Sequence, residues 1–165
     1  MTAGREIALA REGQLEAIAR VMTAARAIMR ADGNHRQWVG GYPSREAILR
    51  DIAADAGYVV TDEGEVVAYF AFVPSPEPTY DRIDGAWLDD ERPYHVIHRL
   101  GSYAHVHGIF ADVIDYCATR ERNLRIDTHS DNSIMRHNIE RHGFTYCGVI
   151  YLADGSPRLA YQRLD

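Results

Sequence analysis

Polar side chains crowd the segment RIDTHSDNSIMRHNIERHGF, residues 125–144, which holds three histidines, two aspartates and two asparagines. Imidazole and carboxylate groups are common ligands of transition metals, so a metal site is the first chemistry to weigh. On a helix, residues five apart are rotated by about 140°, and His137 and His142 therefore do not share a face. A histidine-based metalloprotein is the least favoured class, and we expect no metal.

Most of this polarity fits the two ends of a helix. An alternating strand over 124–128 is followed by residues 130–132, Ser-Asp-Asn, whose side chains favour the N-cap position. Gly143 follows the last helical residue, where a left-handed C-cap belongs, and Phe144 opens the next strand. The segment therefore predicts a strand, a capped helix and a second strand.

Hydrophobic periodicity predicts the elements that position this segment. Apolar residues three and four apart indicate helices, and short apolar runs bounded by Gly, Pro or Asp indicate strands. The expected helices are 12–33, 45–57, 108–122 and 131–142, and the expected strands are 6–10, 58–61, 65–73, 94–103, 124–129, 144–152 and 158–164. This order predicts one mixed α/β domain over 1–165, with a βαβ crossover in its second half.

Composition excludes several classes of protein. With 46% hydrophobic and 25% charged residues, the 165-residue chain is typical of one globular domain. A net charge of -6 argues against a nucleic-acid or anionic-membrane partner. The N-terminus lacks the apolar stretch of a signal peptide, and the two cysteines form no C-x-x-C pair. We expect a soluble cytoplasmic protein without disulfides.

Two large aromatic residues, Trp38 and Tyr42, lie in the predicted loop HRQWVGGYP, residues 35–43. They could form a lid over a binding pocket, or they could pin the loop to the core. Both interpretations stay open at this point.

Four motifs occur in a familiar order: HRLGS (98–102), LRIDTHSDN (124–132), GFTYCGVIYL (143–152) and RLAYQ (158–162). Together with the order of elements, they resemble the GNAT superfamily of acetyl-CoA-dependent N-acetyltransferases over essentially the whole chain, and most closely a bacterial subgroup of largely unassigned substrate. The resemblance implies a mixed, mostly antiparallel sheet of about seven strands flanked by about four helices, with a splay between strands four and five.

The resemblance also implies an activity and its co-substrate. The protein would transfer an acetyl group from acetyl-CoA to a primary amine of a small molecule or peptide, by direct attack in a ternary complex. The pantetheine arm would pair with the backbone of 100–102, and the pyrophosphate would meet the loop that opens the third helix. The implied cofactor-binding residues are Leu100, Gly101, Ser102, His105, Val106, His107, Gly108, Ile109, Phe110, Ala111 and Asn132.

This phosphate loop departs from the family pattern. Only Gly108 matches well, because His105 replaces the usual Gln or Arg and Phe110 replaces a Gly or Ala. Either Ala111 takes the small-residue role, or CoA binds weakly. His105 and His107 could donate to phosphate or could be ordinary exposed histidines, and Asn132 could contact the cofactor arm, cap its helix, or do both.

Catalytic residues follow less directly. His98 is the candidate general base, because imidazole titrates near neutral pH, although a strand histidine is also a common structural residue. Ile139 stands where the family has the tyrosine that protonates the departing thiolate. Candidate substitutes are Tyr103, Tyr146 and Tyr151, of which Tyr146 and Tyr151 are preferred.

The acceptor side and the partners complete the expectations. Trp38, Tyr42 and the loop 74–93 would line the acceptor pocket, since these segments vary the substrate in such folds. The identity of the amine and the presence of a homodimer stay open. An alternative, motivated by Phe110 and Ile139, is a non-catalytic acyl-CoA-binding module that acts as a sensor or partner protein.

Overall fold

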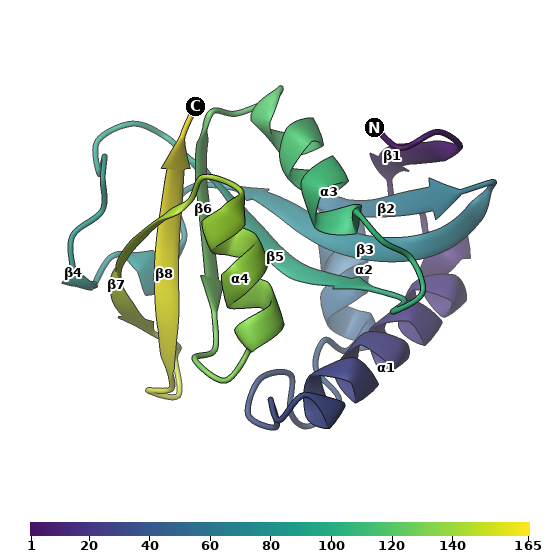
Figure 1. The fold of residues 1–165 in the computed structure, drawn as a ribbon, viewed down its shortest axis with the longest axis horizontal. Coiled ribbons are helices and arrows are strands. Elements are labelled where there is room, and N and C mark those ends of the chain that lie inside the picture. Colours follow the sequence, from purple (N-terminus) through teal and green to yellow (C-terminus); the bar gives the residue numbers. More distant parts are fainter.

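Helices cover both faces of a single eight-stranded sheet in a computed structural model that describes residues 1–165 (Figure 1). The helices are α1 (Leu15–Ala31), α2 (Arg45–Ala53), α3 (Ile109–Ala118) and α4 (Ser133–Arg141). The strands are β1 (Arg5–Leu9), β2 (Gly57–Asp62), β3 (Glu65–Pro74), β4 (Asp84–Gly85), β5 (His95–Ser102), β6 (Asn123–Thr128), β7 (Thr145–Tyr151) and β8 (Pro157–Leu164). The mixed α/β fold predicted from the sequence is confirmed.

The sheet divides between β5 and β6. Its strand order is β1-β2-β3-β5-β6-β8-β7-β4, and β5–β6 is the one parallel pair. These two strands pair only through His95 with Leu124 and Val96 with Arg125, and then diverge, as Figure 1 shows. This is the splay that the family resemblance implied between the fourth and fifth predicted strands.

One strand was not predicted. Asp84 and Gly85 form the two-residue β4, which pairs with Gly148 and Val149 of β7, so the sheet has eight strands rather than about seven. Two residues carry no alternating pattern from which a strand could be recognised. The close contact between β4 and β7 depends on glycine, because a Cβ on Gly85 or Gly148 would lie 2.1–2.2 Å from a carbonyl oxygen of the opposite strand.

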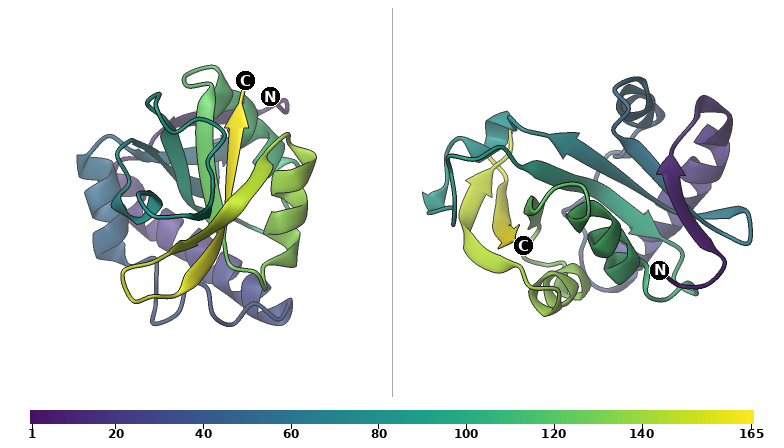
Figure 2. Two further views of the ribbon diagram at one scale, coloured as in Figure 1. Left: turned by 90° about the vertical axis from the view of Figure 1, so that its left-hand side faces the viewer. Right: turned by 90° about the horizontal axis from the view of Figure 1, so that it is seen from above.

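Separate apolar clusters form on the two faces of the sheet. Helices α1 and α2 pack on one face around Ile18, Met22 and Tyr69, and α3 and α4 pack on the other around Phe70 and Ile114. The views in Figure 2 show the two helix pairs on opposite sides of the strands. Each large apolar side chain buried in this way contributes about 1.5–3 kcal/mol to the hydrophobic stabilisation. None of the helices has the length and apolar character needed to cross a membrane.

Capping residues set most of the predicted helix ends. The Ser44 hydroxyl accepts the Ala47 amide at 3.1 Å at the start of α2, and Gly143 adopts a φ of 85° after α4. The predicted 45–57 helix is too long, however. It ends at Ala53 because Asp55 takes a left-handed φ of 55° before β2 begins.

A bulge interrupts β5 beside the splay. Tyr69 faces Gly101 and Ala71 faces His98, so one residue of β3 lies opposite two residues of β5. Arg99, one of these two, has a φ of 53°, an unfavourable conformation for a residue with a long side chain. Its guanidinium donates to the two carboxylate oxygens of buried Asp51 at 2.9 and 2.6 Å, which fixes the bulge against α2.

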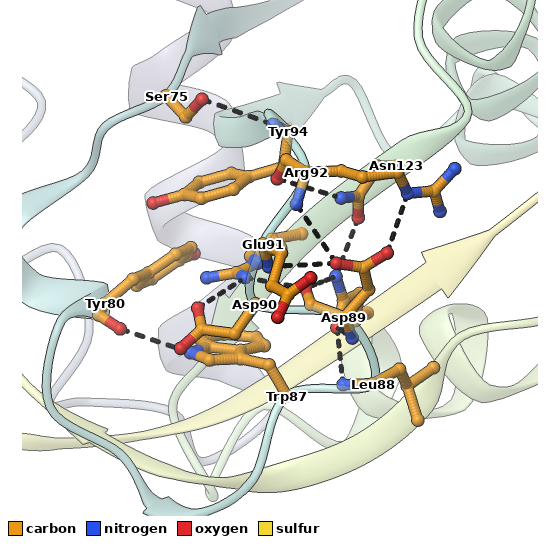
Figure 3. A network of polar contacts seen from close by, with 12 residues as sticks. Ser75, Tyr80, Trp87, Leu88, Asp89, Asp90, Glu91, Arg92, Tyr94 and Asn123 are labelled. Carbon is orange, nitrogen blue, oxygen red and sulfur yellow. Dashed lines mark hydrogen bonds and ion pairs between the residues drawn. The ribbon is translucent and has the colours of Figure 1, made fainter.

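A second buried cation joins the two halves of the sheet where they still pair. Arg125 of β6 is 1% exposed, with its guanidinium carbon 3.9 Å from the Trp87 ring centre and 3.8 Å from that of Tyr94. It donates to the carbonyl of Asp89 at 3.0 Å. Figure 3 shows the loop that precedes β5, from Trp87 to Tyr94, and the hydrogen bonds that its residues make. The long loop before β5 is therefore anchored to the sheet.

The bulge gives a test of the fold. Asp51→Ala is expected to lower the free energy of unfolding by about 3 kcal/mol, because it leaves the half-buried Arg99 guanidinium without its carboxylate and the buried Tyr69 hydroxyl without its acceptor. Chemical denaturation measures the change. The matched control is Glu16→Ala, which breaks the exposed ion pair between Glu16 and Arg45 and should change stability little. Equal effects of the two substitutions would show that the Asp51 pair does not hold the bulge.

Candidate functional site

A cavity of about 470 Å³ opens where β5 and β6 separate. Its walls come from the loop after α1, from β5 and β6, and from the β7–β8 hairpin. The loop after α1 and the hairpin lie at the bottom of Figure 1. Apolar and charged groups both line it. The charged and histidine side chains are Arg36, Glu77, His98, Arg99, Asp127, Asp154 and Arg158.

A smaller cavity of about 130 Å³ lies on the other side of the same gap, between α1, β5, α3 and α4. Residues that line both cavities include Leu100, Asn132 and Met135. The two cavities therefore meet at the splay. A ligand that extends along β5 from the smaller cavity would end at the larger one.

The exposed edge of β5 provides a backbone surface for such a ligand. Beyond Val96 this edge has no partner on β6, and Leu100, Gly101 and Ser102 line the smaller cavity. Peptide groups on an unpaired edge readily accept an extended ligand as an additional strand. Gly101 is needed for another reason: a Cβ there would lie 3.0 Å from the Ala25 Cβ of α1. Glycine therefore lets α1 pack directly on this edge.

The start of α3 provides a second polar surface. Gly108 occupies the N-cap with a φ of 79°, and the amides of Ile109, Phe110 and Ala111 precede the first intrahelical hydrogen bond, from Asp112 to Gly108. These free amides and the helix dipole favour an anion. Arg5 donates to the Asp112 carboxylate at 2.9 Å, so the acidic group in this first turn is neutralised.

The other predicted loop residues divide into exposed and buried ones. His105 and His107 are exposed beside Gly108, while Val106 packs against the core. Phe110 is buried, with its ring 5.0 Å from that of His142, and it lines the smaller cavity. Its bulk therefore points into the protein rather than across the free amides of α3.

His98 lies in the wall of the larger cavity, as expected of a residue that acts on a ligand there. Its Nε2 is 3.8 Å from the Glu77 Oε2, and Thr79 donates its hydroxyl to Glu77 at 2.8 Å. The His98 ring and then the Thr79 hydroxyl hold the pKa of Glu77 down, to about 2. Glu77 is thus a carboxylate at neutral pH and faces the His98 ring.

Neither preferred tyrosine lies at either cavity. Tyr146 is 53% exposed on β7, and Tyr151 on the same strand donates its hydroxyl to Asp84 at 2.6 Å. Strand β8 separates β7 from β6 and the gap. Tyr103, the third candidate, stacks on His105 and also lies outside both cavities. The expected role of Tyr146 or Tyr151 as the acid therefore has no geometric support, because β8 lies between β7 and the gap.

The structure pins Trp38 of the aromatic loop to the core and places both Trp38 and Tyr42 in the wall of the larger cavity. Trp38 is 8% exposed and packs in the cluster of α1 and α2, so it pins the loop, and it also lines the larger cavity. Tyr42 is 39% exposed, lines the same cavity and accepts a hydrogen bond from Arg99 at 3.0 Å. Gln37, the residue before Trp38, accepts a hydrogen bond from the Asn132 side-chain amide at 3.1 Å.

Asn132 caps α4 and also lines both cavities. Its Oδ1 accepts the Met135 amide at 3.1 Å, which confirms the predicted cap. The residues of α4 that line the smaller cavity are Ile134, Met135 and Asn138. Ile139, by contrast, is 0% exposed in the main core cluster. The position that resembles the family tyrosine therefore packs the core and lines neither cavity.

Sequence analysis placed the loop 74–93 at the acceptor pocket, and Glu77 and Thr79 of this loop do line the larger cavity. It did not single out Glu77, Asp127 or Arg158, and the Pro-rich loop carries no pattern that distinguishes Glu77. Arg158 had a detectable signal, since β8 alternates Arg158, Ala160 and Gln162 on one face, with charged or polar groups where a buried face is expected.

Solved structures reveal the relatives of the chain, whereas no protein-family model and no curated protein sequence matches it. A GNAT-family acetyltransferase from Streptococcus agalactiae superposes with a TM-score of 0.90 at 31% identity, covering 99% of this chain and 96% of that one. A GNAT-family acetyltransferase from Listeria monocytogenes gives 0.73 at 16% identity, covering 100% and 99%. A GNAT-like decarboxylase in complex with isobutyryl-CoA gives 0.69 at 13% identity, covering 96% and 98%.

The Glu77–His98 pair predicts a pH-dependent stability. A carboxylate whose pKa is lower in the folded chain, about 2, than in the unfolded one stabilises the fold above the unfolded value, roughly 4.3. Unfolding titrations should therefore find Glu77→Gln less stable than the original protein by about 1 kcal/mol near neutral pH, with the difference vanishing as the pH falls toward about 2. Glu65→Gln, at an exposed residue without side-chain hydrogen bonds, is the control. A pH-independent difference for Glu77→Gln would exclude the ion pair as its cause.

Proposed function

Because the chain belongs to the GNAT family of acetyltransferases, we propose that it transfers an acetyl group from acetyl-CoA to a primary amine of a small molecule or peptide, in a ternary complex. The observation that carries the proposal is the meeting of two cavities at the β5–β6 gap. One cavity would receive the arm of the co-substrate, and the other would admit the amine beside His98.

The residues around the smaller cavity suit acetyl-CoA. The unpaired edge of β5 at Leu100–Ser102 offers hydrogen bonds to an amide-containing arm, and the free amides after Gly108 offer a site for phosphate. The exposed His105 and His107 flank that site. When bound, acetyl-CoA supplies an acetyl group activated as a thioester. The chain itself then has to orient the amine and remove its proton.

His98 is the proposed general base. The amine nitrogen forms a bond to the acetyl carbonyl carbon while the carbon–sulfur bond breaks, and His98 takes the proton that the nitrogen loses, directly or through one water. Glu77, 3.8 Å from the His98 Nε2, stabilises the imidazolium that results. A backbone amide of the β5 edge would stabilise the negative charge that develops on the carbonyl oxygen.

Departure of the thiolate needs no tyrosine in this proposal. Ile139 is buried in the core, while Tyr146 and Tyr151 lie on a strand away from the gap. A thiol with a pKa near 8.5 leaves as a thiolate at moderate cost near neutral pH, and solvent then protonates it. Protonation by solvent therefore replaces the expected protonation of the thiolate by a tyrosine of β7.

The alternative function, a non-catalytic acyl-CoA-binding module, makes a different prediction. Such a module would bind acetyl-CoA, and no amine would accelerate the release of CoA thiol. An assay of thiol release with a panel of primary amines separates the two functions, and isothermal titration shows independently whether acetyl-CoA binds.

The base has its own test. His98→Gln is expected to lower kcat by about 10²- to 10⁴-fold, because a general base is removed, and to leave acetyl-CoA affinity nearly unchanged. Matched controls are Tyr146→Phe and Tyr151→Phe, which remove hydroxyls away from both cavities and should leave kcat within about twofold. Thiol-release kinetics at saturating acetyl-CoA measure all three variants.

Each result has a contrary outcome. Normal turnover of His98→Gln would remove His98 from the mechanism. A tenfold or larger loss in Tyr146→Phe or Tyr151→Phe would restore the tyrosine route and would require β7 to approach the gap during turnover.

A further inference from the structure

Arg158 is a buried cation in the wall of the larger cavity that forms no ion pair with a carboxylate of the chain. The residue is 8% exposed and lies at the start of β8. Its one hydrogen bond, at 2.8 Å, goes from Nη1 to the carbonyl of the preceding residue, Pro157. It takes part in none of the ion pairs of the chain. Four of the five N–H donors of its guanidinium are therefore available.

Several other charged groups of the cavity have partners within the chain. Arg99 is held by Asp51 at 2.6 Å, and Glu77 lies beside His98. The Asp127 carboxylate accepts the Tyr80 hydroxyl at 2.6 Å. Asp127 and Asp154 attract Arg158 from a distance, and burial still lowers the pKa of Arg158. A buried guanidinium without a direct counter-ion is costly, which is a reason to expect an anion from outside.

The positions of the charges match a molecule with two ionic ends. Arg158 lies on β8, on one side of the gap, whereas His98 and Glu77 belong to β5 and the loop that precedes it, on the other. One side is therefore suited to an anion and the other to an amine. Apolar side chains complete the cavity wall and would accommodate a hydrocarbon substituent; they include Met29, Trp38, Val73, Ile97 and Leu152.

We infer that the acceptor is an amine that also carries a carboxylate, of the amino-acid class, with Arg158 binding the carboxylate while the amine faces His98. This inference rests on the proposed function and adds the substrate class to it. A planar guanidinium binds a planar carboxylate through two parallel hydrogen bonds, which fixes the orientation of the acceptor as well as its affinity. Arg36, exposed in the same wall, adds positive potential on the approach to the cavity.

Three matched series of acceptors test the inference. Thiol release from acetyl-CoA is measured with the proteinogenic L-amino acids, with their α-amides and with the corresponding decarboxylated amines. The amide series removes the negative charge and keeps the size of the molecule, and the amine series removes the whole group. We expect at least one amino acid to exceed both of its analogues in kcat/KM by roughly tenfold or more, the effect of a hydrogen bond to a charged group.

Variants of β8 assign the effect to one side chain. Arg158→Gln should lower kcat/KM for the preferred amino acid by roughly 10- to 100-fold, mainly through KM, and should leave that of its decarboxylated amine unchanged. Arg163→Gln, the same change on the same strand outside both cavities, should leave both values unchanged. Equal acetyl-CoA affinity in the variants shows that they are folded. If Arg158→Gln does not fold, Arg158→Lys, which keeps the charge and loses the planar fork, takes its place and should also raise KM selectively.

The outcomes separate this inference from the function on which it rests. Acetylation of amides or decarboxylated amines in preference to every amino acid would overturn the inference and keep the acetyltransferase. Equal losses for acid and amine acceptors in a folded Arg158 variant would overturn it as well. Binding of acetyl-CoA without thiol release in any series would overturn the proposed function, and the inference with it.

Discussion

The buried pair of Asp51 and Arg99 is the interaction on which the site depends. Arg99 adopts a left-handed backbone at the bulge of β5, a conformation that costs of order 1–3 kcal/mol unless its surroundings fix it. Two hydrogen bonds to Asp51 and one to the Tyr42 hydroxyl provide that constraint. The bulge lies in the part of β5 that no longer pairs with β6, so the same contacts hold the backbone of β5 where it borders the gap. The loop that carries Tyr42 is fixed by the same guanidinium.

A second cation limits the opening. Where β5 and β6 still pair, Arg125 lies between the rings of Trp87 and Tyr94 and binds the loop that leads into β5. The parallel strands are therefore held together over two residue pairs and held apart beyond them. This combination produces a fixed opening rather than a loose sheet edge. A fixed opening is what an enzyme requires to orient two substrates without rebuilding its site in every cycle.

Local signals were sufficient to predict the order of elements and most helix ends. Ser44, Asn132 and Gly143 act through their own backbone geometry, which depends little on distant residues, and their predicted roles are confirmed. The splay also followed, through resemblance to a family. In contrast, β4 consists of two residues and depends on glycines at Gly85 and Gly148, which only the folded sheet brings together.

The candidate site was less predictable because it is assembled from distant segments. Tyr146 and Tyr151 follow the right helix in sequence, yet the strand order places β8 between them and the gap. Chain order alone cannot reveal that β8 inserts next to β6. Glu77 and Arg158 acquire their importance from His98 and from the absence of a counter-ion, both of which are tertiary properties. The family resemblance therefore indicated the β5 side of the site and, on the acceptor side, Trp38, Tyr42 and the loop 74–93, but it did not indicate Arg158.

We propose that the co-substrate binds in the gap between β5 and β6. Nuclear magnetic resonance titration of the labelled protein with acetyl-CoA, following each backbone amide, is the direct test. Binding in the gap predicts the largest shifts along the β5 edge at Leu100–Ser102 and at the start of α3, at Gly108–Ala111, with smaller shifts in the β7–β8 hairpin. Shifts concentrated in that hairpin or at β1, with the β5 edge unmoved, would contradict it.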